Sequence, residues 1–423
     1  MLNEPCLHQK TSEAADVETP LPMGWPYRFA AAAGLAVSTV YFAQPLLGSM
    51  GTEFGVNPSV IGLVVTATQL LYAAGLLLLV PLGDIVNRRK LIMGHMLLSA
   101  AALAVVGSAA TLAQLLAGAA AVGMMAVVTQ TLVAYASDQA KAAERGRTVG
   151  IVTGGIVIGI LIARTFSGLM AAWFGWRSVY YASSLLMLIT AYLLSSMLPD
   201  VPKGGRGAQK LPYRNLIASV FRLFAAERVF RIRAVLAFLI FTAFSTLWTS
   251  MILPLSAPPF NLSEAQVGLM GLLGAAGAFG AAKAGSLADK GFGQRTTGVS
   301  LVILLLSWLP IASLQHSLPL FLLGIVLLDF AVQAVHVTNQ GLILATQPDA
   351  RSRLTGGYMM FYSFGSALGA IVSTMLYAHF GWIAVCSWGA SIRRAGTAVL
   401  AGNAEARLIK KDKQAEAACL IAV

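Results

Sequence analysis

The chain has 423 residues, of which 57% are hydrophobic and only 11% are charged. An average soluble protein carries roughly 25% charged residues, so this chain could not cover a water-facing surface, and its apolar content also excludes intrinsic disorder. The formal net charge of +12 would suit a nucleic-acid-binding protein, but only if the basic residues formed one continuous face.

The first segment, residues 1–27, is polar and contains four acidic residues but no apolar stretch. It is therefore predicted to be a cytoplasmic tail rather than a signal peptide. The three cysteines (Cys6, Cys386 and Cys419) have neither metal-binding spacing nor the pattern of a disulfide framework. No metal site and no cofactor are expected.

Apolar runs long enough to cross a bilayer follow one another along the remaining chain, since a spanning helix needs about 20 mostly apolar residues. The runs are predicted at 29–50, 60–82, 91–110, 113–136, 149–171, 178–198, 234–255, 266–288, 298–314, 318–345 and 356–378. These runs predict an all-α polytopic membrane protein.

A twelfth run begins near Gly381 but is interrupted by Arg393 and Arg394. Two arginines near the middle of a span would cost about 5–7 kcal/mol. The twelfth helix is therefore doubtful: either it ends near Ile392, or the sequence is altered after about Ser387.

Basic residues gather in the loops after the even-numbered spans, whereas the loops after odd-numbered spans contain only Arg177 as a basic residue. Positive charge in short loops marks the cytoplasmic side, so both termini are predicted to be cytoplasmic. Because the charge is divided among separate loops, no nucleic-acid-binding face is expected. The longest basic loop, 199–233, is interpreted as a solvated linker that sets topology, with binding to anionic lipid as the alternative.

The two halves of the chain repeat each other at a spacing of 206 residues. The matched positions are Gly62 and Gly268, Arg145-Gly146-Arg147 and Arg351-Ser352-Arg353, and Phe174-Gly175-Trp176 and Phe380-Gly381-Trp382. An offset of six spans preserves membrane orientation, so the repeat predicts two parallel six-helix bundles. These bundles are expected at 28–198 and 234–402, joined by the linker 199–233 and followed by a charged cytoplasmic tail at 403–423.

Glycines recur about every four residues in several spans. They include Gly150, Gly154, Gly155, Gly159 and Gly168 in the fifth span, and Gly271, Gly274, Gly277 and Gly280 in the eighth. Small residues let helix backbones approach closely in lipid, so helix packing is their expected role.

The loops after the second and eighth spans carry related motifs. The first reads Leu82-Gly83-Asp84 followed by Arg88-Arg89-Lys90, and the second reads Gly285-Ser286-Leu287-Ala288-Asp289-Lys290 with Arg295 beyond. Both resemble the loop motif of the major facilitator superfamily. Segments 41–47 and 328–340 resemble a bacterial branch of drug and sugar efflux permeases. The resemblance covers residues 25–386 and implies the twelve-helix fold of that superfamily.

The resemblance also implies a gating role for charged residues at the cytoplasmic ends of the spans. In the family, the loop aspartate pairs with charges and a helix N-terminus and holds the two halves in an outward-facing state. The residues concerned are Asp84, Arg88, Arg89, Asp138, Asp289, Lys290 and Arg295, with Asp138 expected beside Arg88 or Arg89. The alternative is that they are ordinary interfacial charges. An intramembrane aspartyl protease is not expected, because its two carboxylates share a proton inside the membrane, whereas Asp84 and Asp289 adjoin basic loops.

Ionisable residues within spans are functional candidates, because a charge at the bilayer centre costs about 2.5–3.5 kcal/mol. A polar stripe in the tenth span is predicted to line a central cavity and consists of Asp329, Gln333, His336 and Gln340. Within it, Asp329 and His336 are expected to exchange protons. Arg164, in the fifth span, needs a carboxylate, a carbonyl or an anionic substrate as its partner. Further cavity candidates are Tyr41, Gln44 and Gln130. The alternative for the stripe and for Arg164 is a permanent structural network.

No nucleotide-binding loop is found in the sequence, so energy for transport must come from an ion or solute gradient. The sequence predicts a secondary active transporter of the bacterial inner membrane, and not an enzyme, which exports a small organic molecule in exchange for protons. Sodium is the alternative coupling ion. A monomer in the lipid bilayer is expected. The alternatives are an uptake symporter and a non-transporting or inactive membrane protein of the same fold.

Overall fold

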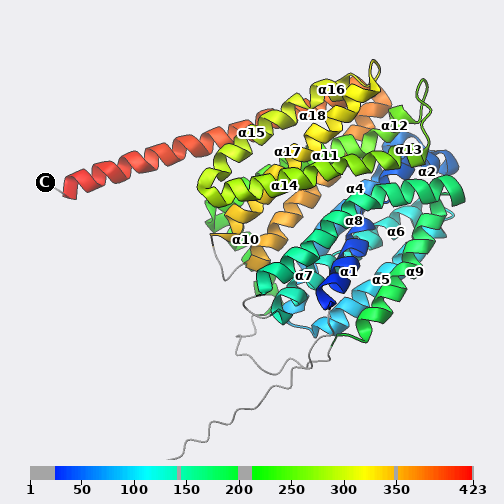
Figure 1. The fold of residues 1–423 in the computed structure, drawn as a ribbon, viewed down its shortest axis with the longest axis horizontal. Coiled ribbons are helices and arrows are strands. Elements are labelled where there is room, and N and C mark those ends of the chain that lie inside the picture. Colours follow the sequence, from blue (N-terminus) through cyan, green and yellow to red (C-terminus); the bar gives the residue numbers. More distant parts are fainter. Residues whose placement is uncertain (1–23, 141–143, 199–211, 347–350, 422–423) are drawn as a thin grey trace, which may run out of the picture.

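The computed structural model describes residues 24–140, 144–198, 212–346 and 351–421. These residues form helices and contain no β-strand (Figure 1). Ten of the helical segments in this part of the chain are long and apolar enough to cross a membrane. The predicted all-α membrane fold is therefore confirmed, and the two halves of the chain lie side by side in Figure 1.

The N-terminal half contains the elements α1 to α9. Their bounds are α1 Trp25–Ser38, η1 Gln44–Leu46, α2 Leu47–Phe54, α3 Pro58–Ile61, α4 Leu63–Leu78, η2 Val80–Asp84, α5 Arg88–Gly107, α6 Leu112–Met125, α7 Val128–Gln139, α8 Arg145–Phe174 and α9 Trp176–Ser195. The first predicted span, 29–50, is not one continuous helix, because α1 ends at Ser38 and a turn separates it from η1 and α2. Pro45 lies in η1, and its ring removes a backbone N–H donor from the helix.

The C-terminal half contains the elements α11 to α18. Their bounds are α11 Arg228–Ser250, α12 Ile252–Leu255, α13 Glu264–Leu269, η3 Met270–Gly274, α14 Ala275–Leu287, η4 Ala288–Phe292, α15 Gly293–Leu306, α16 Trp308–Ala312, α17 Leu318–Leu344 and α18 Arg351–Ile421. The eighth span changes helix type along its length but is not broken, because α13, the 3₁₀ helix η3 and α14 follow one another directly.

The linker between the halves is more than a solvated chain. Residues 199–211 lie outside the described residues, but α10 (Tyr213–Ala226) is a helix that buries Leu216 and Val220. The Tyr213 hydroxyl donates a hydrogen bond to the carbonyl oxygen of Leu78 in α4, over 2.5 Å. The Phe224 ring stacks on Phe361 of α18 with 4.9 Å between centroids. Thus α10 packs against both halves.

The end of the chain differs from the prediction. The backbone of α18 stays helical to Ile421, so the helix does not end near Ile392, and its last part projects from the bundle in Figure 1. The side chains of residues 393–421, including Arg393 and Arg394, lie outside the described ones. Within α18 the backbone turns at Gly381, with a φ of 74°, as it does at Gly175 between α8 and α9, with a φ of 78°. A positive φ favours glycine, so the repeated Phe-Gly-Trp motif marks equivalent turns.

The two halves touch through matched contacts at the end of the bundle opposite the loops that carry Arg88 and Lys290. Gly62 lies against Thr374 of α18, and Gly268 lies against Gly168 of α8. In both contacts the partners of one half are 206 residues from their counterparts in the other. The sequence repeat therefore extends to the interface between the halves.

Glycines of α8 let it pack closely on α1. A Cβ atom at Gly155 would meet the Ala30 carbonyl oxygen, and one at Gly159 would meet Gly34. The Ser38 hydroxyl donates a hydrogen bond of 2.8 Å to the carbonyl oxygen of Gly159. The predicted packing role is wrong for Gly150 and Gly154, since no described atom would lie within 4 Å of a Cβ there.

At the same end as the Gly62 contact, Glu53 joins the last turn of α2 to the start of α9. It pairs with Arg177 and accepts a hydrogen bond of 2.6 Å from the Trp176 indole nitrogen. Arg177 also donates to the carbonyl oxygen of Ala109, after α5, over 2.6 Å. The hydrogen bonds from Arg177 and then Trp176 lower the pKa of Glu53 below its ordinary value of 4.5.

Replacing Gly155 by leucine should destabilise the protein, whereas the same change at Gly154 should not. Overpacking a close contact typically costs about 1–3 kcal/mol, and only Gly155 lies against a neighbouring backbone. The thermal unfolding midpoint of both variants in detergent, compared with the parent chain, measures the difference. Equal midpoints would show that the α1–α8 contact tolerates a side chain.

The Glu53 pair should give a stability difference that depends on pH. A carboxyl whose folded pKa is lowered stabilises the fold above its unfolded pKa, near 4.5, and loses this contribution as pH falls through the folded pKa. At pH 7 the variant Glu53→Gln should therefore melt below the parent chain, and the gap should close below pH 4.5. The effect should be small and sensitive to salt, because the Glu53 side chain is 43% exposed. A gap that persists unchanged at pH 3 would contradict the ion pair's contribution.

Candidate functional site

The candidate site is built around Arg164, which α8 places at the interface between the halves. The residue is 2% exposed. Its Nε donates a hydrogen bond of 2.7 Å to Oε1 of Gln44. Its Nη2 is buried and has no hydrogen-bond partner among the described residues. Since a guanidinium stays protonated in proteins, a full positive charge lies at this point inside the bundle.

Aromatic faces surround the Arg164 guanidinium. Its central carbon lies 4.0 Å from the ring centroid of Trp248, 5.0 Å from that of Tyr41 and 5.3 Å from that of Phe244. A cation over an aromatic face gains about 2 kcal/mol or more where water is excluded. These rings therefore stabilise the charge without occupying its N–H donors.

The close packing of α8 with α1 brings these groups together. The glycine contacts hold α8 against α1, and the turn after α1 then places Tyr41 and Gln44 beside Arg164. On the other side, Gly271 of η3 faces the Arg164 Cβ, because a Cβ added there would lie 3.0 Å away. A larger residue than glycine at either contact would push Arg164 out of position.

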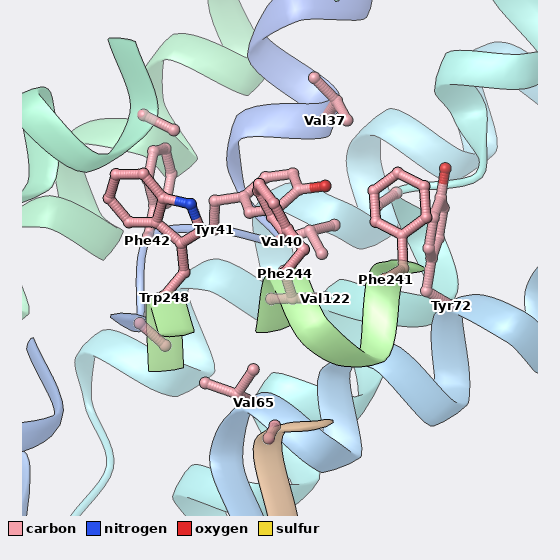
Figure 2. Packing of buried hydrophobic residues seen from close by; sticks show 14 of the residues in the cluster. Val37, Val40, Tyr41, Phe42, Val65, Tyr72, Val122, Phe241, Phe244 and Trp248 are labelled. Atoms are coloured by element: carbon pink, nitrogen blue, oxygen red, sulfur yellow. The ribbon is translucent and has the colours of Figure 1, made fainter. Parts of the chain in front are cut away.

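Asp329 is the negative charge of the site. It lies on α17, is 3% exposed and accepts a hydrogen bond of 3.0 Å at Oδ1 from the Trp248 indole nitrogen. Asp329 and Arg164 interact electrostatically. Trp248 contacts both residues, because its N–H group donates to Asp329 and its ring face lies against Arg164. In Figure 2, Trp248 and Phe244 extend from one helix beside Tyr41. The site therefore joins a cation of one half to a carboxylate of the other.

The predicted stripe on α17 divides between two neighbours. Asp329 and Gln333 face η3 and α14, where a Cβ at Gly274 would lie 2.9 Å from the Asp329 Oδ2 and one at Gly277 would lie 2.8 Å from the Gln333 Cγ. His336 and Gln340 instead face α18, where the partners are Tyr358, 3.0 Å from the His336 Nδ1, and Met359, whose sulfur is 3.9 Å from the Gln340 Nε2.

One further hydrogen bond crosses between the halves near the site. The Tyr41 hydroxyl makes a hydrogen bond with the Tyr362 hydroxyl of α18. Tyr362 packs on Phe241 of α11 with 3.8 Å between ring centroids. Gln130, on α7, is partly buried and lies near the Tyr72 hydroxyl rather than beside Arg164.

The predicted gating residues lie at the basic end of the bundle, where Arg88, Asp138 and Lys290 are found. Arg88 pairs with Asp138 and donates a second hydrogen bond of 3.0 Å to the Gly83 carbonyl oxygen. Arg89 donates to the Ser195 carbonyl oxygen over 3.0 Å. Lys290 is exposed, and the Arg295 guanidinium lies 5.7 Å from the Phe292 ring centroid. The side chains of Asp84 and Asp289 lie outside the described ones.

Arg233 corrects the predicted boundary of the linker. It was expected among the solvated basic residues of 199–233, but it is 2% exposed and lies within α11. Its guanidinium donates to Thr297 over 3.0 Å, to Asn339 over 3.1 Å and to Gln294 over 2.6 Å. The basic residue is buried because these side-chain oxygens satisfy its donors.

The sequence did not single out Trp248, Phe244 or Tyr362. The sequence signal that could have identified the first two is a run of aromatic residues at helical spacing on one face of α11, namely Phe241, Phe244 and Trp248. Aromatic residues are common in apolar spans, so this spacing alone does not distinguish a site from a core. Among the described residues, no cluster of three histidine, cysteine or acidic side chains could hold a metal ion.

Comparison with known proteins gives a consistent family. The sequence profile described as Major Facilitator Superfamily matches residues 29–309 and 234–390. The "Putative uncharacterized transporter YgaY" of Escherichia coli strain K12 is 46% identical over 361 residues, which cover 85% of this chain and 91% of that protein. The "Probable transporter SCO4007" of Streptomyces coelicolor is 31% identical over 364 residues, which cover 84% of this chain and 81% of that protein.

Solved structures share the fold at low identity. A bacterial homolog of the human lysosomal transporter Spinster, in an inward-facing and occupied conformation, superposes with a TM-score of 0.71 at 17% identity and covers 89% of this chain and 93% of its own. A mutant form of the nucleoside transporter NupG gives a TM-score of 0.68 at 15% identity, over 89% of this chain and 99% of its own.

Replacing Trp248 by phenylalanine should cost more stability than replacing Trp308 by phenylalanine. The first change keeps a ring over Arg164 but removes the N–H donor of Asp329, and a buried acceptor left without its donor costs about 1–3 kcal/mol. Trp308 is a matched control because its buried indole nitrogen has no hydrogen-bond partner among the described residues. Thermal unfolding in detergent measures both changes. The loss from Trp248→Phe should shrink in an Asp329→Ala background, and an equal loss in both backgrounds would contradict the hydrogen bond's contribution.

Proposed function

The chain belongs to the major facilitator superfamily, and on that basis we propose that it is a secondary active transporter that exports a small organic molecule in exchange for protons. It is a multi-pass membrane protein, and its named relatives are transporters. The class of substrate, the coupling ion and the direction of transport are our proposals.

One observation carries the proposal of proton coupling: a buried carboxylate lies opposite a buried cation at the interface between the halves. Asp329 comes from the C-terminal half and Arg164 from the N-terminal half, with Trp248 in contact with both. Protonation of Asp329 would remove the negative charge that balances Arg164, in a region where charge imbalance is costly. Binding and release of one proton would thus change the energy of the contact between the halves.

The same contacts suit alternating access. The halves meet through the Tyr41–Tyr362 hydrogen bond and the Arg164–Trp248 contact near the site. They meet again where Gly268 touches Gly168. A rocking motion would separate these contacts in turn, because repeat-based transporters move one bundle against the other around a fixed site.

The basic end is proposed to gate the cytoplasmic side. There, Arg88 and Asp138 hold the loop after α4 against the end of α7, and we assign Asp84 and Asp289 to the same gate on the strength of their motifs. The basic loops support a cytoplasmic location for both termini in a bacterial inner membrane. Export is favoured over uptake by the likeness of segments 41–47 and 328–340 to efflux permeases, and a monomer is the proposed working unit.

Replacing Asp329 by asparagine should abolish proton-linked flux while the protein still folds and inserts. Asparagine keeps the size and the acceptor for Trp248 but takes up no proton. In everted membrane vesicles, addition of a transported solute should dissipate an imposed pH gradient with the parent chain and leave it unchanged with Asp329→Asn. Glu144→Gln, which alters an exposed carboxylate at the basic end, is the matched control and should behave as the parent.

Four results would overturn parts of the proposal. Persistent proton release with Asp329→Asn would remove that residue from coupling, and a sodium gradient that drives flux at constant pH would change the ion. If no solute from a broad panel moved under either gradient, a non-transporting member of the family would be the better description. Solute entry that follows the proton inward would indicate an uptake symporter.

A further inference from the structure

The structure points to a zwitterionic substrate of the amino-acid class, with an apolar side chain, and this inference rests on the proposed transport function. We infer that the substrate carboxylate binds Arg164 and that its ammonium group binds Asp329. Neither the fold nor the family decides the chemistry of the solute.

The first observation is the unused donor of Arg164. A guanidinium has five N–H donors in a planar fork, and here the Nε bond to Gln44 is made while the buried Nη2 has no partner among the described residues. Buried donors of a charged group that lack an acceptor are costly. If Arg164 had only a permanent structural role, we would expect a carboxylate of the chain to accept hydrogen bonds from its free donors. The fork matches the two oxygens of a substrate carboxylate.

The second observation is the corresponding free acceptor on Asp329. Its Oδ1 accepts the Trp248 hydrogen bond, whereas its Oδ2 accepts none from the described residues and faces Gly274. No direct hydrogen bond joins Asp329 to Arg164 among the described side chains, and Trp248 contacts both residues. Arg164 therefore keeps one buried donor without a partner, and Asp329 keeps one carboxylate oxygen without a hydrogen bond, among the described residues.

The spacing of the two charges suits one small zwitterion. Arg164 lies 4.0 Å from the Trp248 ring centroid, and the indole nitrogen of that ring lies 3.0 Å from Asp329. Arg164 thus lies over the face of the Trp248 ring and Asp329 lies at its N–H edge, so the adjacent carboxylate and ammonium groups of an α-amino acid have one oppositely charged partner each on the same indole. Gly271 and Gly274 of η3 place no side chain beside either charge, and a Cβ at these positions would lie 3.0 Å from the Arg164 Cβ and 2.9 Å from the Asp329 Oδ2, so η3 packs directly against both residues.

The surrounding side chains select an apolar substrate side chain. The rings of Tyr41, Phe244 and Trp248 surround the Arg164 guanidinium and make the region next to it apolar. The other titratable groups near it are Tyr362, bonded to Tyr41, and His336, which packs on Phe241 two turns along α17. Neither bears a second fixed charge, so a solute with an additional ionised group would lack a partner.

Zwitterion binding also explains exchange with protons. A substrate ammonium group and a proton would compete for the same Asp329 carboxylate, so that loading one requires release of the other. An anion that bound Arg164 alone would instead favour a protonated Asp329 and move together with the proton. Antiport is thus the expected consequence of the ammonium contact.

The test uses the purified full-length chain and three probes, L-phenylalanine, L-leucine and L-methionine, with binding measured by calorimetry. For L-phenylalanine, the matched analogues are 2-phenylethylamine, which lacks the carboxylate, and 3-phenylpropionate, which lacks the ammonium group. We expect at least one amino acid to bind, and each analogue of a binding amino acid to bind about tenfold to a hundredfold more weakly, the range for a lost charged hydrogen bond.

Variants of Arg164 and Asp329 test each contact through the preference for the amino acid over its analogue, and not through loss of binding alone. Arg164→Gln should erase the preference for the amino acid over its amine analogue, and Asp329→Asn should erase the preference over its acid analogue. A purely structural role for either residue would weaken all ligands equally, which would overturn the assignment. Because the analogue comparison is also made on the parent chain, it holds even if one variant fails to fold.

The inference and the proposed function fail in different ways. If none of the three amino acids binds while another solute moves under a pH gradient, the substrate class is wrong and the transport function stands. If an amino acid binds and both analogues bind equally well, the two-point contact is wrong. If no solute of any class moves in vesicles, the transport proposal itself fails.

Discussion

The hydrocarbon core of a bilayer offers no hydrogen bonds, and this constraint determines how the protein holds charge. A buried cation or carboxylate must find its partners within the chain. Arg164 is held mainly by aromatic faces and by one amide oxygen, while Asp329 is held by one indole N–H. Partners of this kind stabilise the charges without neutralising them, so the pair remains able to bind a proton or a polar solute.

Close packing on small residues gives this site its geometry. Gly155 and Gly159 bring the backbone of α8 against α1, and Gly271 lets η3 pack against Arg164 on the opposite side. Without a hydrophobic driving force between helices in lipid, such contacts decide which spans become neighbours. Contacts of the same kind, between small residues, are also found at the interface between the halves, where one bundle would have to slide on the other.

The scaffold is repeated but the site is not. Gly62 with Thr374 and Gly268 with Gly168 form equivalent contacts in the two halves, and Gly175 and Gly381 form equivalent turns. At the same spacing of 206 residues, however, Arg164 corresponds to Ala370 and Asp329 corresponds to Gly123. Each half thus contributes one charge of opposite sign to a single site, and the two halves have equivalent helices but different chemistry.

Apolar run lengths predicted most of the spans and charged loops predicted their orientation, while matched short motifs indicated the repeat and the resemblance to the family, because all of these are visible in the sequence. The candidates Asp329 and Arg164 could likewise be named, since an ionised group within an apolar run is evident in the sequence. Their partners could not be named: Trp248 and Phe244 look like any aromatic residues of a span, and Arg233 looks like a loop residue until its oxygen partners surround it. Only the tertiary structure decided that Arg164 meets aromatic rings rather than a carboxylate, because that choice depends on which backbones approach closely across more than a hundred residues of sequence.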